Sequence, residues 1–174
     1  MKYAILLLFV VGCQQPAGNP PTQARTALLT AMNDRLALME KVAAYKFINK
    51  KPIADPGREA ALLEAMETRA LSYGLPPKDV RRFFEAQIEA AKMVQTNLIA
   101  EWERSGAGPA LPVTDLKDVR TKIDAVNERL LDALNHDRPY RDQKKELSSA
   151  AEKLLVTPGV TAEVRQRALR PLVQ

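Results

Sequence analysis

A chain of 174 residues, of which 27% are charged and only 5% aromatic, is long enough for one compact domain and has a composition that favours helix. Its formal net charge is +5, from 26 basic and 21 acidic residues. The basic residues alternate with acidic ones and form no run interleaved with aromatic residues, which argues against a nucleic-acid-binding surface. A small anionic ligand is compatible with this charge.

The first residues have the pattern of an export signal. Lys2 precedes a short apolar run, Ala4 to Val11, which is too short to span a bilayer as a stable helix. The stretch Val10-Val11-Gly12-Cys13 resembles the lipobox of bacterial lipoproteins, in which the signal is cut before a cysteine that then carries the lipid. We predict a signal peptide over residues 1–12, a lipid anchor to the membrane at Cys13 and a periplasmic location. The alternative is a simple secretory signal with an incidental cysteine.

The next segment has the composition of a linker. Residues 14–22 contain three Pro, one Gly and one Asn, which predicts a flexible tether over residues 13–22. Cys13 is the single cysteine of the chain, so an intramolecular disulfide is impossible. We expect one domain over residues 23–174.

Helical spacing of apolar residues predicts a long first helix from about Gln23 to Asn49. A second helix is predicted from Pro56 to Tyr73, because Asp55 supplies an N-cap, Pro56 suits the first helical position and Gly74 suits the end. The apolar positions of the first helix are Leu28, Leu29, Met32, Leu36, Met39, Ala43 and Phe47, and those of the second are Leu62, Leu63, Met66 and Leu71.

The second half of the chain continues in the same way. Pro76-Pro77 begins a long third helix that reaches about Arg104, and residues 105–114, with two Gly and two Pro, form a loop. Further helices are predicted over residues 115–135, 139–155 and 161–172, the last two separated by Thr157-Pro158-Gly159. Inward-facing residues of the third helix are Val80, Phe83, Phe84, Ile88, Val94, Leu98, Ile99 and Trp102. The pattern predicts an all-α, single-domain bundle of five to six helices.

Polar residues interrupt two of the apolar stripes. Arg35 and Lys46 are 11 positions apart, so they lie within about 20° of each other around the helix and about 16 Å apart along it. In the third helix Gln87, Ala91 and Gln95 follow one another at intervals of four. Buried polar groups are costly without partners, so these positions indicate a polar pocket inside the bundle. Taken singly, each also has a simpler interpretation, because long cations reach solvent from a buried stem and Gln caps nearby backbone.

The segment that holds these positions carries a family resemblance. It runs from RLALMEKVAAYKFINKKPIADPGREAALLEAM, beginning at Arg35, to VRRFFEAQIEAAKMVQ, ending at Gln95. This segment resembles the all-helical chorismate mutases, particularly their exported subclass. The resemblance extends more loosely through DVRTKIDAVNERLL, where Arg120 matches a further cation. It implies conversion of chorismate to prephenate, with no metal and no cofactor.

The resemblance also implies roles for individual residues. Ala91 departs from the pattern, because relatives often have a small polar residue there to hold a carboxylate, and a methyl group cannot. Arg35, Arg58 and Arg120 would bind the substrate carboxylates, Lys46 a carboxylate and the ether oxygen of the breaking C–O bond, Gln95 the same ether oxygen, and Asp55 and Glu59 would lie near the ring hydroxyl.

The residue types suit such a reaction. An intramolecular pericyclic rearrangement needs no nucleophile or general base. It needs fixed carboxylates and donors aimed at an oxygen that gains negative charge. Two alternatives remain: an isochorismate pyruvate lyase on the same fold, and a helical lipoprotein adaptor without catalysis, in which Arg35, Lys46 and Arg58 would be solvated and apart. A homodimer with an active site inside each subunit is compatible with the chain length.

Overall fold

The computed structural model describes residues 19–111 and 115–174, which form six α-helices, two short 3-10 helices and no strand. The predicted all-α bundle with long first and third helices is confirmed, since α1 and α3 each have 29 residues. The predicted signal peptide and Cys13 lie outside the described residues. The helices are α1 (Pro20–Ile48), α2 (Pro56–Ala70), α3 (Pro77–Ser105), α4 (Leu116–Asp137), α5 (Lys144–Leu154) and α6 (Ala162–Val173), with η1 (Leu71–Tyr73) after α2 and η2 (Arg138–Tyr140) after α4.

Side-chain caps begin three of these helices. The Asp55 carboxylate accepts a hydrogen bond from the Arg58 backbone N–H at 3.2 Å, which fixes the start of α2. Asp115 accepts from the Lys117 N–H at 2.9 Å at the start of α4, and the Thr161 hydroxyl caps α6. Each of these starts lies within one residue of its predicted position, and the Asp55 cap is the one that the sequence predicted.

Two helix starts differ from the prediction. Helix α1 begins at Pro20 rather than near Gln23, because a helix tolerates proline in its first turn, where backbone N–H groups have no intrahelical partner. Helix α5 begins at Lys144 rather than at Pro139, which lies in η2. The tight turn of η1 also leaves Leu71, predicted as part of an apolar stripe, 72% exposed.

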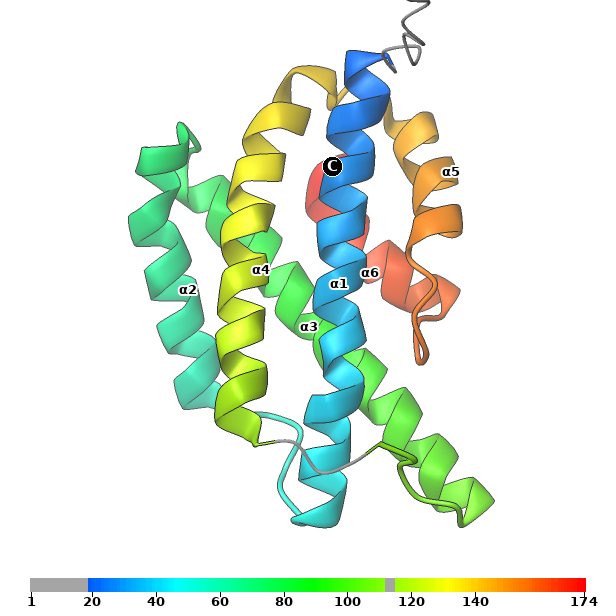
Figure 1. Cartoon of the computed structure of the whole chain (residues 1–174). Coiled ribbons are helices and arrows are strands. Elements are labelled where there is room, and N and C mark those ends of the chain that lie inside the picture. The colour runs from blue at the N-terminus through cyan, green and yellow to red at the C-terminus, as the bar shows by residue number, and fades with distance from the viewer. Residues whose placement is uncertain (1–18, 112–114) are drawn as a thin grey trace, which may run out of the picture.

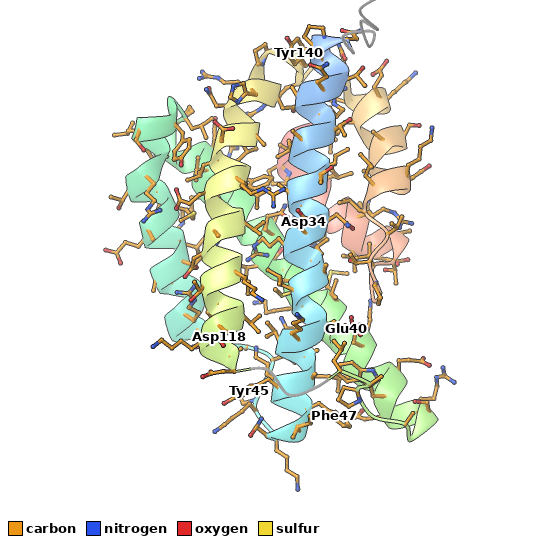
Figure 2. The ribbon with its side chains drawn as sticks, in the orientation of Figure 1. Asp34, Glu40, Tyr45, Phe47, Asp118 and Tyr140 are labelled. Carbon is orange, nitrogen blue, oxygen red and sulfur yellow. The ribbon has the colours of Figure 1, made fainter. Side chains whose placement is uncertain are left out.

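Helix α1 is the centre of the bundle. It packs against α3, α4 and α5, and α3 packs in turn against α2 and α6. In Figure 1, α1 and α4 run side by side in opposite directions, with α2 beyond α4 and with α3 crossing behind. Figure 2 shows Phe47, near the end of α1, and Asp118, near the start of α4, at the same end of the bundle, with Tyr140 at the opposite end. No helix in the described part of the chain is long and apolar enough to cross a membrane.

The end of the bundle near Tyr140 contains a buried ion pair. Arg25 and Asp137 are 4% and 1% exposed, and the Arg25 Nε lies 3.5 Å from the Asp137 carboxylate. Arg25 also donates from Nη2 to the Tyr140 backbone carbonyl at 2.7 Å. Burial raises the pKa of Asp137 above its ordinary value, against the opposing effect of Arg25. This pair joins the start of α1 to the end of α4.

The loop between α5 and α6 packs closely on α3. Gly159 has a φ of +81°, and its carbonyl accepts a hydrogen bond from Asn97 Nδ2 at 2.9 Å. A Cβ atom at Gly159 would lie 3.0 Å from the Leu98 side chain and 3.1 Å from the Val94 carbonyl oxygen. Only glycine fits here without displacement, because both the backbone angle and the space exclude a side chain.

Candidate active site

A pocket opens between α1, α2, α3 and α4, in the half of the bundle that contains the end of α1. It contains about 630 Å³ of atom-free space, counting its open mouth, within the size range of small-molecule sites. All seven residues predicted to bind or transform a substrate line it: Arg35 and Lys46 from α1, Asp55 before α2, Arg58 and Glu59 from α2, Gln95 from α3 and Arg120 from α4. The apolar part of the wall includes Met39, Val42, Leu62, Ile88 and Ile123.

Arg35 lies deep in this pocket and is 4% exposed. Its Nε donates to Asn127 Oδ1 at 3.1 Å, and its Nη1 donates to the Gln87 backbone carbonyl at 3.0 Å. Neither acceptor is charged, and no carboxylate within the described ranges forms an ion pair with this guanidinium. Burial, with a smaller effect of Arg58, lowers the pKa of Arg35 to about 10. In the described part of the chain, Arg35 is therefore a buried cation with no directly paired carboxylate.

Lys46 and Gln95 form the other deep polar groups. Lys46 is 8% exposed, its ammonium donates to the Ile53 backbone carbonyl, and burial lowers its pKa. No ion pair involves it among residues 19–111 and 115–174. Gln95 Nε2 donates to the Ala91 carbonyl at 3.1 Å, and its Oε1 is buried with no partner in the described structure. Both groups have capacity for a polar ligand.

The outer cations, in contrast, are paired. Arg120 Nη2 lies 2.7 Å from the Asp55 carboxylate, and Lys92 Nζ lies 3.0 Å from that of Glu59. Burial would raise the pKa of Glu59, but the hydrogen bonds from Lys92 and from the Asp55 backbone N–H outweigh it and hold that pKa below its ordinary value. Glu59 is therefore held as an anion at the pocket wall.

Positive charge predominates around the pocket. Five cationic and two anionic side chains line it, which gives the lining a net charge of +3. Arg58 additionally pairs with Asp124 of α4, which lies beside the pocket, at 2.5 Å, so the local excess is two positive charges. A dianion of small size would balance this excess. No group of three or more His, Cys, Asp or Glu residues suited to a metal occurs in the described ranges.

Sequence reasoning misplaced one polar residue and missed two. Gln87, expected in the polar pocket, does not line it, since its amide donates to the Ala168 carbonyl at 2.9 Å. Lys92 lines the pocket beside Ala91 and was not predicted. Asn127, which accepts a hydrogen bond from Arg35, was also not predicted. Its polar side chain lies between Val126 and Leu130 of an apolar stripe, and this position could have indicated a buried polar contact.

The adaptor alternative required Arg35, Lys46 and Arg58 to be solvated and apart. This expectation is wrong, because the three side chains line one pocket and the first two are buried. Arg35 and Lys46 lie on the same wall of the bundle, as their interval of 11 residues predicts. The pocket geometry suits a small anionic ligand and gives the isochorismate alternative no separate support.

Known proteins resemble the chain throughout this region. The family model of type II chorismate mutases matches residues 26–96. A monofunctional chorismate mutase of Enterobacter agglomerans is 34% identical over 119 residues, covering 68% of this chain and 65% of the relative. A secreted chorismate mutase of Mycolicibacterium smegmatis is 31% identical over 112 residues, covering 64% and 62%. The chain thus spans slightly less than two thirds of the length of these two curated relatives.

The likeness extends to three dimensions. The crystal structure of a chorismate mutase from Burkholderia thailandensis is 37% identical, superimposes with a TM-score of 0.76, and is covered over 99% of its length by 86% of this chain. The matched segment 26–96 contains six of the seven predicted site residues, and the seventh, Arg120, lines the same pocket from α4. Sequence, fold and pocket agree, and the chain therefore belongs to the type II chorismate mutases.

Proposed function

We propose that the chain is a chorismate mutase, converting chorismate to prephenate. The observation that carries the proposal is the pair of deep cations, Arg35 and Lys46, which are buried at one pocket without a carboxylate partner in the described structure. Burying unpaired charge is costly, so a fold that retains both cations has a use for them. Chorismate is a dianion, and the pocket has an excess of two positive charges.

Three guanidinium groups would hold the two carboxylates of the substrate. Among the described residues no carboxylate forms an ion pair with Arg35, whereas Arg58 and Arg120 are paired with Asp124 and Asp55. Arg58 and Arg120 are partly exposed, so exchange of these partners for substrate carboxylates requires only side-chain movement. Guanidinium forks suit carboxylates, and fixing both ends of the substrate selects the compact conformer that rearranges.

Lys46 and Gln95 would stabilise the transition state. Negative charge develops on the ether oxygen as the C–O bond breaks, and preorganised donors stabilise it. The Gln95 amide would turn its Nε2 from the Ala91 carbonyl toward this oxygen. Asp55 and Glu59 would lie near the ring hydroxyl and accept a hydrogen bond from it. The methyl of Ala91 offers the substrate no hydrogen bond, and the neighbouring Lys92 lines the pocket at that level.

An assay of the chain from Asn19 onward tests the proposal. The enzyme should consume chorismate and release prephenate without added metal or nucleotide, and chelation should leave the rate unchanged. The variant Lys122→Ala removes a positive charge at an exposed position outside the pocket, and it serves as the control for variants of the pocket cations. Turnover of isochorismate with no turnover of chorismate would identify the lyase instead, and turnover of neither substrate would refute both activities.

We also propose that the protein is exported and anchored by lipid at Cys13. The support is the signal-like segment before Cys13 and the similarity to the secreted chorismate mutase of Mycolicibacterium smegmatis. One lipid-bearing cysteine after a cleaved signal anchors a protein without spanning the membrane. Cys13→Ser should release the protein from membranes with unchanged catalysis, and continued sedimentation with membranes would contradict the anchor.

The site is proposed to be complete within one subunit, in a monomer or in a homodimer. Its support is that Arg35, Lys46 and Arg120 of a single chain line the same pocket. Mixing Arg120→Ala protein with Lys46→Ala protein should therefore restore no activity, because every subunit in the mixture carries one defective site. Recovery of activity after mixing would show that subunits share residues.

A further inference from the structure

Within the described ranges, Arg35 donates hydrogen bonds to neutral groups. Asn127 of α4 is wholly buried, with 0% exposure, and its Oδ1 accepts the Nε–H of Arg35 at 3.1 Å. The second acceptor is the backbone carbonyl of Gln87, 3.0 Å from Nη1. Together they fix the orientation of the guanidinium and leave its charge uncompensated.

Elsewhere the same fold pairs a buried arginine with a carboxylate. Arg25 is as buried as Arg35, at 4% exposure, and has Asp137 at 3.5 Å. Buried charges in proteins are ordinarily paired in this way. At Arg35 an amide occupies the position where a carboxylate of the same size would fit, and the carboxylate of Asp124, which also influences Arg35, is paired with Arg58 instead.

We propose that Asn127 is a positioning residue that also determines specificity: it orients Arg35 through a neutral oxygen and so reserves the positive charge of Arg35 for a carboxylate of the ligand. This inference rests on the proposed function, in which the ligand is the chorismate dianion. An aspartate at this position would orient Arg35 equally well but would neutralise it. The anion site would then lose one of its two excess positive charges.

The amide imposes a cost that supports this role. Asn127 Nδ2 is buried and has no hydrogen-bond partner in the described structure. Only the oxygen of the side-chain amide is hydrogen-bonded, and leaving the buried nitrogen unpaired costs stability. A carboxylate would replace this unpaired donor with an acceptor, and its charge would strengthen the contact with the Arg35 guanidinium. Stability of the empty protein therefore favours aspartate, whereas anion binding favours asparagine.

The substitution Asn127→Asp in the full chain, purified in detergent, tests the inference. The melting temperature of the ligand-free protein should rise. The KM for chorismate should rise by about 10- to 100-fold, the loss expected for one charge-assisted contact, with a much smaller change in kcat, because Arg35 holds the carboxylate in the ground state and transition state alike. Thermal stabilisation by added sulfate should also weaken. Asn135→Asp, an exposed position on the same helix, is the matched control and should leave KM unchanged.

A second variant separates positioning from packing. Asn127→Ala removes the acceptor, so it should lower the melting temperature and raise KM. Asn127→Asp, in contrast, should raise the melting temperature as well as KM. A merely structural asparagine would give two destabilised variants with KM unchanged, and that result, or an unfolded Asn127→Asp protein, overturns the inference. Wild-type protein that consumes no chorismate would refute the proposed function, and the melting temperatures and sulfate response would still decide the role of Asn127.

Discussion

The contact of Gly159 with α3 predicts a specific loss of stability for Gly159→Ala. A left-handed backbone angle costs a non-glycine residue about 1–2 kcal/mol, of which about 0.4–1 kcal/mol is recovered because alanine restricts the unfolded chain. The new methyl group would also meet Leu98 at 3.0 Å and the Val94 carbonyl at 3.1 Å. Such overpacking costs about 1–3 kcal/mol, and the Val94 backbone cannot turn aside as a side chain could.

Gly106 provides a matched control for the backbone term. Its φ is +67°, and a Cβ atom there would meet nothing within 4 Å. Gly106→Ala should therefore lose only the conformational part of the free energy of unfolding. The difference between the two variants isolates the contact and should be about 1–3 kcal/mol, or about 2–12 °C in melting temperature for a domain of this size.

Denaturant unfolding followed by circular dichroism measures this difference, and thermal melting provides a second measurement. Equal losses in the two variants would refute the packing of the loop on α3. Val94 and Leu98 flank Gln95 in the chain, so a displaced α3 should also lower kcat at temperatures where Gly159→Ala protein remains folded.

Three further predictions concern the pocket. Lys46→Ala should lower kcat by about 100- to 1,000-fold, the usual effect of removing one preorganised donor, with an unchanged circular dichroism spectrum; near-normal kcat would contradict the role of Lys46. Lys92→Met removes one of the hydrogen bonds that hold the pKa of Glu59 below its ordinary value. Glu59 should then protonate at a higher pH, and the acid limb of kcat/KM should move upward. An unmoved limb would show that Glu59 ionisation is irrelevant to catalysis. Gln95→Glu should make kcat/KM rise as pH falls, because only a protonated carboxyl group can donate to the ether oxygen; a profile parallel to that of the wild type would remove Gln95 from that position.

Sequence reasoning succeeded where local chemistry decides the structure. The Asp55-Pro56 start of α2 and the glycine after η1 are signals in which one residue type satisfies one backbone requirement. It failed at Pro20 and Pro139, because proline is compatible with a linker, a first helical turn and a 3-10 turn alike. Tertiary packing, which the sequence pattern does not contain, selects among these.

The same distinction applies to the pocket. The interval between Arg35 and Lys46 could be interpreted because helix geometry alone puts both on one wall. Lys92 could not be found in this way, since only the position of α2 relative to α3 brings it within 3.0 Å of Glu59. Asn127 is intermediate: its polarity inside an apolar stripe marks it as unusual, but its partner Arg35 lies 92 positions away.

Arg35 and Lys46 are buried and form no ion pair among the described residues, and this has a consequence for how the protein is handled. Any small anion that enters the pocket removes an electrostatic penalty from the folded state and none from the unfolded chain, so occupancy and folding are thermodynamically linked. A ligand at 100 times its Kd adds about 2.7 kcal/mol to the free energy of unfolding. The melting temperature should therefore report anion binding to the pocket, and it should depend on whether the buffer anion is chloride, sulfate or a dicarboxylate.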